Sequence, residues 1–175
     1  MPITSYIRTI KHYPKQGIMY RDITTLLKDP VGFHIAIDAL VERYNKMKID
    51  KIVGIESRGF IIGAPLAYAL GVGFVPIRKQ GKLPSETIGQ DYQLEYGTDR
   101  IEIHTDAINK GEQVLLVDDL IATGGTAEAA IILLHKMDAD IVECSFLIDL
   151  PDIGGRQRLQ KMNQKVFSLC EFKGD

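Results

Sequence analysis

Two adjacent carboxylates beside a run of small residues are the groups of this sequence whose chemistry is easiest to interpret. Asp118 and Asp119 follow the apolar run Val114–Val117, and the small residues 122–126 begin after two further residues. Backbone N–H groups at the start of a helix bind anions, most simply a phosphate. Paired acids accept hydrogen bonds from vicinal hydroxyls and suit a hydrated divalent cation. The pattern therefore predicts a site for a ribose 5-phosphate.

The same residues also have a simpler interpretation, as a tight Gly-Gly turn after a strand and an acid that caps a helix. The whole string favours the site, because four apolar residues, Asp-Asp, three spacers and Thr-Gly-Gly-Thr rarely occur together by chance. It is not a P-loop, since no Lys follows the glycines.

The elements that must position this string are those of an α/β fold with a mostly parallel sheet flanked by helices. Runs that are apolar on both faces are typical of strands inside such a sheet, and its ligands lie beyond the carboxyl ends of the strands. Helical patterns alternate with these runs, which indicates βαβ units. The buried strands are expected at 51–56, 71–79, 114–117 and 140–150, with an edge strand at 166–170. A short helix is expected at 152–161, with Gly154 and Gly155 loosening its start.

The first long helix has a clear beginning. Asp29 is expected to be its N-cap and Pro30 its first helical residue. Apolar residues then recur every three or four positions, which predicts one buried stripe. That stripe consists of Phe33, Ile37, Leu40, Tyr44 and Met47.

Two further segments suggest parts of the site. Residues 57–60 (Ser-Arg-Gly-Phe) lie between an expected strand and a helix, so they are a second candidate anion site to which Arg58 adds bidentate reach. Residues 80–90 form a long polar loop, and 91–97 and 100–104 alternate like the strands of a hairpin. A flap of this kind over the sheet would exclude water from a reactive sugar.

The N-terminal segment 13–25 has two interpretations. Ile18, Met19 and Tyr20 place apolar bulk beside Arg21 and Asp22. The segment is either an arm that packs on the core or a cap that closes over a flat apolar ligand. Composition alone favours the arm.

Length and composition bound the remaining possibilities. The chain of 175 residues fits a single domain, and 45% hydrophobic and 25% charged residues are typical of a globular protein. A net charge of −2 argues against a nucleic-acid partner, and no apolar run is long enough to predict a membrane span. Two isolated cysteines, Cys144 and Cys170, favour a reducing cytoplasm, and no Cys/His spacing suggests a structural metal.

Further segments extend the pattern to most of the chain. The string Val-Asp-Asp-Leu-Ile-Ala-Thr-Gly-Gly-Thr resembles the PRPP-binding motif of the type I phosphoribosyltransferases, where PRPP is phosphoribosyl diphosphate. The chain also resembles the members of that family specific for adenine in five other segments, 14–23, 27–30, 57–60, 78–84 and 92–97. The resemblance implies that the chain transfers the 5-phosphoribosyl group from PRPP to adenine in purine salvage, giving AMP and diphosphate. It also implies one domain over 1–175, with a hood at about 1–28 and a flap at about 80–104, and a homodimer.

The resemblance assigns roles to particular residues. The 5-phosphate would lie on Ala122, Thr123, Gly124, Gly125 and Thr126, and the ribose hydroxyls on Asp118 and Asp119. Other PRPP contacts would come from Ser57, Arg58, Lys79, Lys82 and Tyr96, with Mg²⁺ bridging the diphosphate. Protein ligands for Mg²⁺ are not specified, apart from Asp118 and Asp119 through water. Met19, Tyr20 and Arg21 would form the hood that reads the adenine edge.

Glu95 would be the general acid/base, exchanging a proton with adenine near N7. From the residues alone, a solvated hairpin charge is the better interpretation of Glu95.

Three other functions remain open. They are a phosphoribosyltransferase for another purine base, a PRPP-binding regulator without catalysis, and a nucleotide-binding redox domain. The redox domain is disfavoured because no glycine fingerprint follows the first strand. The regulator is disfavoured because Lys82 and Glu95 are both present.

Overall fold

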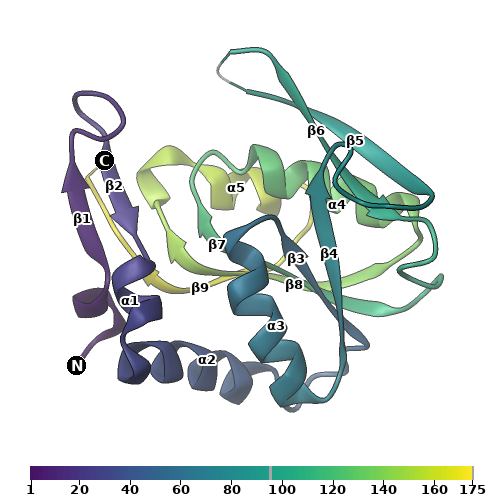
Figure 1. Ribbon diagram of the computed structural model, residues 1–175, viewed down its shortest axis with the longest axis horizontal. Helices are drawn as coiled ribbons and strands as arrows, with labels where there is room; N and C mark the ends of the chain where they lie inside the picture. The colour runs from purple at the N-terminus through teal and green to yellow at the C-terminus, as the bar shows by residue number, and fades with distance from the viewer. Residues whose placement is uncertain (95, 175) are drawn as a thin grey trace.

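The strands expected from the apolar runs join one central sheet in the computed structural model, which describes residues 1–94 and 96–174. Its strands are β3 (Lys51–Ile55), β4 (Gly73–Lys79), β5 (Thr87–Gln93), β6 (Thr98–His104), β7 (Gln113–Ile121), β8 (Asp140–Asp149) and β9 (Val166–Glu171). Within the described residues their order across the sheet is β5-β6-β4-β3-β7-β8-β9. Strands β4, β3, β7, β8 and β9 are parallel neighbours in that order. Strands β5 and β6 form an antiparallel hairpin that extends the edge beside β4 (Figure 1).

Helices cover both faces of the sheet, as a mostly parallel α/β fold requires. On one face lie α1 (Thr24–Lys28), α2 (Pro30–Tyr44) and α3 (Arg58–Leu70), and on the other lie α4 (Gly125–Lys136) and α5 (Gly155–Gln160). Two short 3₁₀ helices, η1 (Ile3–Tyr6) and η2 (Pro151–Ile153), complete the helical elements of the described chain.

Strand β7 shows why this sequence needs two covering layers. Val114 and Leu116 pack into the core beneath α4, whereas Leu115 and Val117 pack into the core beneath α2 and α3. All four side chains are buried, and full burial of such a side chain contributes about 1.5–3 kcal/mol. The apolar run is therefore continuous because each face of the strand is a core face.

The predicted start of α2 is confirmed. The side chain of Asp29 accepts hydrogen bonds from the backbone N–H groups of Val31 and Gly32, and Pro30 is the first helical residue. The predicted apolar stripe is too long, because α2 ends at Tyr44 and Met47 is 40% exposed. Asn45 follows the last helical residue, and Asn competes with the helix for backbone hydrogen bonds.

Two strands are longer than the sequence pattern predicts. Strand β7 continues through Asp118 and Asp119 to Ile121, because Leu120 and Ile121 still pair with β8. Residues 87–90 were expected in a loop but belong to β5, where they pair with residues 101–104 of β6. Backbone pairing with a partner strand supplies order that these polar residues do not signal in sequence.

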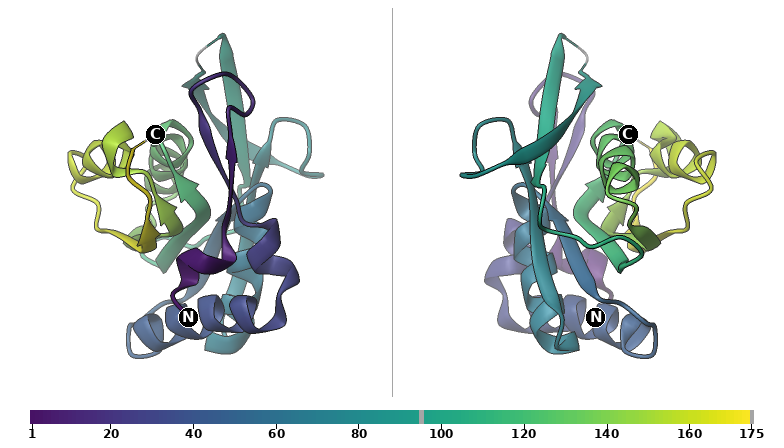
Figure 2. Two further views of the ribbon diagram at one scale, coloured as in Figure 1. Left: turned by 90° about the vertical axis from the view of Figure 1, so that its left-hand side faces the viewer. Right: turned by 90° about the vertical axis from the view of Figure 1, so that its right-hand side faces the viewer.

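The N-terminal residues form a small separate hairpin. Strands β1 (Arg8–Lys11) and β2 (Met19–Asp22) pair antiparallel, and Figure 2 shows this hairpin projecting to the same end of the molecule as the β5–β6 hairpin. The Arg8 guanidinium, followed by the Thr24 hydroxyl, lowers the pKa of the Asp22 carboxyl to about 2. The Arg21 guanidinium lies 4.5 Å from the centre of the Phe172 ring, which joins the hairpin to the C-terminal segment.

Candidate active site

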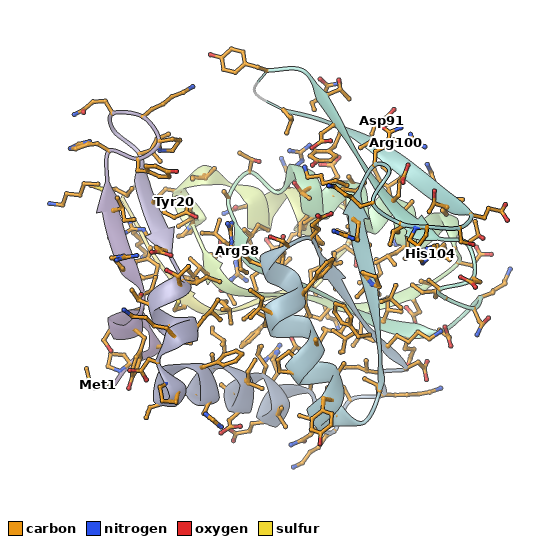
Figure 3. All side chains as sticks on the ribbon, in the orientation of Figure 1. Met1, Tyr20, Arg58, Asp91, Arg100 and His104 are labelled. Atoms are coloured by element: carbon orange, nitrogen blue, oxygen red, sulfur yellow. The ribbon has the colours of Figure 1, made fainter. Side chains whose placement is uncertain are left out.

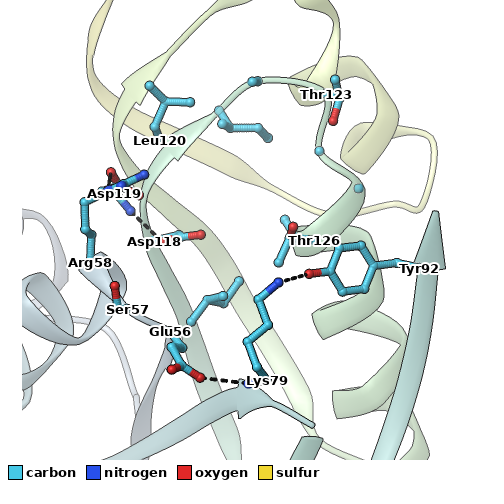
Figure 4. Close-up of a pocket in the computed structure, with 16 residues that line it drawn as sticks. Glu56, Ser57, Arg58, Lys79, Tyr92, Asp118, Asp119, Leu120, Thr123 and Thr126 are labelled. Atoms are coloured by element: carbon cyan, nitrogen blue, oxygen red, sulfur yellow. Dashed lines mark hydrogen bonds and ion pairs between the residues drawn. The ribbon is translucent and has the colours of Figure 1, made fainter. Parts of the chain in front are cut away.

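A cavity of about 350 Å³ opens at the carboxyl ends of β3, β4 and β7 (Figure 4). This is where ligands of open α/β sheets bind. Its walls come from the turn after β3, the end of β4, one residue of β5, and the end of β7 with the loop that follows. The lining residues are Ile55, Glu56, Ser57, Arg58, Lys79, Tyr92 and the continuous run 118–127.

Residues 122–126, which we call the phosphate loop, connect β7 to α4. Gly124 has φ +80°, a left-handed conformation that glycine adopts without strain, and it is the N-cap of α4. Helix α4 has 12 residues and begins at Gly125, so its positive end faces the cavity. The loop can therefore hold an anion with backbone N–H groups, with the Thr123 and Thr126 side chains beside it.

The two acids differ in environment. Asp119 is 5% exposed, and its Oδ2 accepts a hydrogen bond from Arg58 Nε at 2.5 Å. Asp118 Oδ1 accepts a hydrogen bond from the Asp119 backbone N–H at 2.9 Å. Burial, followed by the neighbouring Asp119 charge, raises the pKa of the Asp118 carboxyl well above its usual range. Hydrogen-bond donors or a cation placed against Asp118 would favour its charged form again.

Close contact between α3 and β7 brings Arg58 to these acids. Gly59 is the second residue of α3, and a Cβ atom there would lie 2.8 Å from the Val117 carbonyl oxygen and 3.1 Å from Asp118 Oδ1. Only glycine permits this approach of the two backbones. The peptide bond between Glu56 and Ser57, immediately before the helix, is cis.

Lys79 is held from both sides. Its backbone N–H donates to Glu56 Oε2 at 2.8 Å, and the Arg78 guanidinium donates to Glu56 Oε1 at 3.1 Å. Burial of Glu56 opposes ionisation, but these donors outweigh it and lower the pKa of the Glu56 carboxyl. Lys79 Nζ donates to the Tyr92 hydroxyl at 2.6 Å and forms an ion pair with Asp99.

The Lys79 ammonium remains charged in this setting. Partial burial alone would lower its pKa, but Asp99 and Tyr92 outweigh burial and raise it. The hairpin β5–β6 therefore contributes to the site, since Tyr92 of β5 lines the cavity and Asp99 of β6 pairs with the Lys79 ammonium.

The structure brings together most of the residues predicted to bind PRPP. Ser57, Arg58, Lys79, Asp118, Asp119 and all five residues of the phosphate loop line one cavity. Among the described residues, Lys82 and Tyr96 lie outside its lining, and Tyr96 is 78% exposed with Lys15 Nζ at 5.2 Å from its ring. The backbone N–H of Lys82 donates to the Lys79 carbonyl.

The predicted base-binding residues lie across from the cavity, on strand β2. Met19, Tyr20 and Arg21 are all in this strand, and none of them lines the cavity as the described residues form it. The Tyr20 hydroxyl lies 3.5 Å from an Arg58 nitrogen, and Figure 3 shows the two side chains facing each other. Glu95, the predicted acid/base, lies outside the described residues.

Three residues near the cavity were given no role in the site from the sequence. Glu56 orients the backbone of Lys79, while Tyr92 and Asp99 hold its ammonium group. Tyr92 belongs to the segment 92–97 that suggested a site, but Tyr96 was the tyrosine assigned to it. The alternation of that segment could have identified Tyr92 as the inward-facing residue.

The acids of the cavity fit a divalent cation that is held mainly by its ligand. No cluster of three or more metal-binding side chains occurs among residues 1–94 and 96–174. Mg²⁺ commonly binds through one or two carboxylates together with water and substrate phosphates. Asp118 and Asp119 provide such a pair.

No helix in the described parts of the chain is long and apolar enough to cross a membrane.

Comparison with known proteins gives a consistent result. A family model described as a phosphoribosyl transferase domain matches residues 22–171. The chain is 71% identical to an adenine phosphoribosyltransferase of Nitrosospira multiformis, with 100% of both chains covered. It is 66% identical to the corresponding protein of Nitrosomonas europaea, with 99% of each covered.

Solved structures agree with the family model. The adenine phosphoribosyltransferase of Rhodothermus marinus superposes with a TM-score of 0.90 at 49% identity, covering 97% of this chain and 96% of that one. The Saccharomyces cerevisiae enzyme, in complex with an imino-altritol bisphosphate and adenine, superposes with a TM-score of 0.89 at 43% identity, covering 96% of each chain. The central sheet, the cavity at its carboxyl edge and these full-length matches agree, and the chain belongs to the phosphoribosyltransferase family, among the adenine phosphoribosyltransferases.

Proposed function

We propose that this chain transfers the 5-phosphoribosyl group of PRPP to adenine, which forms AMP and releases diphosphate. The observation that carries the proposal is that one cavity is lined by both the positive end of α4 and the acid pair Asp118–Asp119. A phosphate and a diol are the two features of a ribose 5-phosphate that such groups recognise. Relatives of this chain over its full length are adenine phosphoribosyltransferases.

The proposed roles follow from chemistry. Ala122 to Thr126 bind the 5-phosphate, and Asp118 and Asp119 accept hydrogen bonds from the ribose hydroxyls. Arg58, Ser57 and Lys79 face the same cavity and would bind the diphosphate. Lys82 and Tyr96, which both lie within the flap at about 80–104, would join them when PRPP is bound.

Displacement of diphosphate builds positive charge on the sugar and negative charge on the leaving group. Lys79 and Arg58 stabilise the leaving group by charges that are already in position, which is electrostatic preorganisation. Bound Mg²⁺ would neutralise further negative charge on the diphosphate, held by its oxygens and, through water, by Asp118 and Asp119. The same two acids would stabilise the positive charge that develops on the sugar.

Adenine would lie between the sugar site and strand β2. The backbone of Met19 to Arg21 carries the donors and acceptors that read the adenine edge, and Tyr20 offers an aromatic face. The short separation of the Tyr20 hydroxyl and Arg58 supports a hood close to the sugar site.

Glu95 is proposed as the group that exchanges a proton with adenine near N7. A general acid/base contributes about 10²–10⁴-fold to a rate, so Glu95→Gln should lower kcat within that range and leave PRPP affinity nearly unchanged. Glu86→Gln is the matched control, because Glu86 is an exposed carboxylate in the segment that leads to β5. An unchanged kcat in Glu95→Gln would remove Glu95 from the mechanism.

The experiment that tests the function is diphosphate release from PRPP and Mg²⁺, with adenine, hypoxanthine, guanine and xanthine offered in parallel. We expect release with adenine. Diphosphate release with a 6-oxo base would support the proposed PRPP site but contradict the proposed reading of adenine by the hood. Binding of PRPP without turnover on any base would favour a regulatory protein.

The resemblance also supports three wider proposals. We propose that the chain is one domain over 1–175, with a hood at about 1–28 and a flap at about 80–104. We propose that it acts as a homodimer, which light scattering of the purified chain would test. The two unpaired cysteines support a cytoplasmic location, which fractionation would test.

A further inference from the structure

Helix α5 stands directly behind the phosphate loop, although nothing in the proposed chemistry uses it. The chain leaves β8, passes through η2 and Gly154, and enters α5 at Gly155. The backbone N–H of Gly155 donates to the Ala122 carbonyl at 2.9 Å. The first residue of α5 is therefore hydrogen-bonded to the first residue of the loop.

The two backbones approach each other so closely that only glycine fits at their contact. A Cβ atom at Gly155 would lie 2.3 Å from the Ala122 carbonyl oxygen and 2.9 Å from the Gly124 backbone nitrogen. A Cβ atom at Gly124 would lie 3.1 Å from the Gly155 carbonyl oxygen. Since the nearest of the clashing atoms belongs to the loop backbone, a substitution at Gly155 can be accommodated only if the loop moves.

Arg158, one turn into the helix, makes a second connection. Its Nη1 donates to the Thr123 carbonyl at 3.4 Å, and its Nε forms an ion pair with Glu128. Glu128 lies in the first turn of α4. An acid there interacts favourably with the helix dipole but would repel a phosphate bound at the same helix end.

We propose that Gly155 and Arg158 are positioning residues of the phosphate loop. Gly155 fixes the loop backbone, and Arg158 neutralises Glu128 so that the dianionic 5-phosphate of the sugar substrate can bind. The inference rests on the proposed role of the loop, and it assigns to α5 a part in affinity for the phosphomonoester end of the substrate alone.

The test is calorimetric binding of ribose 5-phosphate and of Mg²⁺-diphosphate to the full chain. Loss of one charged interaction should raise the Kd for ribose 5-phosphate about tenfold in Arg158→Gln, and change the Kd for diphosphate less than about twofold. Arg158→Lys should recover part of the affinity, because it keeps the charge opposite Glu128. Gly155→Ala should weaken ribose 5-phosphate binding at least as much as Arg158→Gln.

Arg156→Gln is the matched control on the same helix. Arg156 bonds to Asp149, Ser168 and the Val166 carbonyl, so its loss should lower Tm without changing the Kd for ribose 5-phosphate. This control separates an effect on the loop from an effect on the fold.

A second substitution tests the charge argument. In the Arg158→Gln background, Glu128→Gln removes the uncompensated acid and should restore most of the lost affinity, which a purely structural role of Arg158 would not produce. Equal Kd values for ribose 5-phosphate in the wild type and Arg158→Gln would overturn the inference alone. Failure of the wild type to bind ribose 5-phosphate would overturn the phosphate loop and the inference together.

Discussion

Asp118→Asn should stabilise the free protein and at the same time weaken its binding of PRPP. Burial and the Asp119 charge raise the pKa of the Asp118 carboxyl, so its ionised form is unfavourable in the folded chain. Asparagine has nearly the same shape, keeps an oxygen that accepts from the Asp119 backbone N–H, and carries no charge. The substitution therefore removes the repulsion and keeps the local geometry.

The sign of the pH dependence follows from the direction of the shift. An acid whose pKa is raised by folding binds its proton more tightly in the folded chain, so its contribution to stability is lost as pH rises through the folded pKa. The advantage of Asp118→Asn should be small below the ordinary Asp pKa of about 3.9 and full above the raised value. Removal of one unfavourable site charge commonly gains about 0.5–2 kcal/mol, which is about 1–8 °C in Tm for a chain of this size.

The assay is thermal unfolding of both proteins across pH, together with PRPP affinity at neutral pH. Because all other carboxyl groups are the same in both proteins, the difference in Tm isolates Asp118. Loss of a hydrogen bond to a charged acceptor should raise the Kd for PRPP about 10- to 150-fold. Asp106→Asn, at an exposed position, is the control and should change neither quantity. A lower Tm for Asp118→Asn at pH 8 would refute the reasoning.

Three other changes have defined outcomes. Asp22→Asn should lower the free energy of unfolding by about 1–2 kcal/mol at pH 7. Because the pKa of Asp22 is about 2, this difference should disappear in denaturant titrations as pH falls from about 4 to about 2. Gly59→Ala should cost about 1–3 kcal/mol of stability by overpacking, whereas Gly73→Ala, whose Cβ would meet its nearest atom at 3.7 Å, should cost less. Tyr92→Phe removes the hydroxyl that bonds to Lys79 and should raise the KM for PRPP about two- to tenfold with little change in Tm.

The parts of the fold that the sequence predicts correctly are those set by neighbours along the chain. The apolar runs that form β3, β4, β7 and β8 are continuous because both faces of each strand are covered, and such a run is visible in the sequence itself. The phosphate loop is equally local, because an anion site made of backbone N–H groups depends on small residues at the start of one helix.

The missed residues depend on pairings between segments distant in sequence. Glu56 can hold Lys79 only because β3 and β4 are parallel neighbours, with the end of β3 at Ile55 paired to Ile77 of β4. Asp99 reaches the Lys79 ammonium because β6 pairs with β4 at Lys79, a register that no residue type signals. Gly155 was interpreted as a loose helix start, whereas its hydrogen bond to Ala122 makes it a point of close contact. The role of Glu95 stays a prediction.

The position of the site at the carboxyl edge has a physical consequence for stability. The chain places Asp118 next to Asp119, which is buried and paired with Arg58, at the end of the strand that carries the core of the sheet. A charge arrangement that is unfavourable in the free protein is favourable once donors and a cation occupy the cavity, so substrate binding should also stabilise the fold. Stability and affinity are therefore linked at Asp118, and a substitution that improves one at this position is expected to reduce the other.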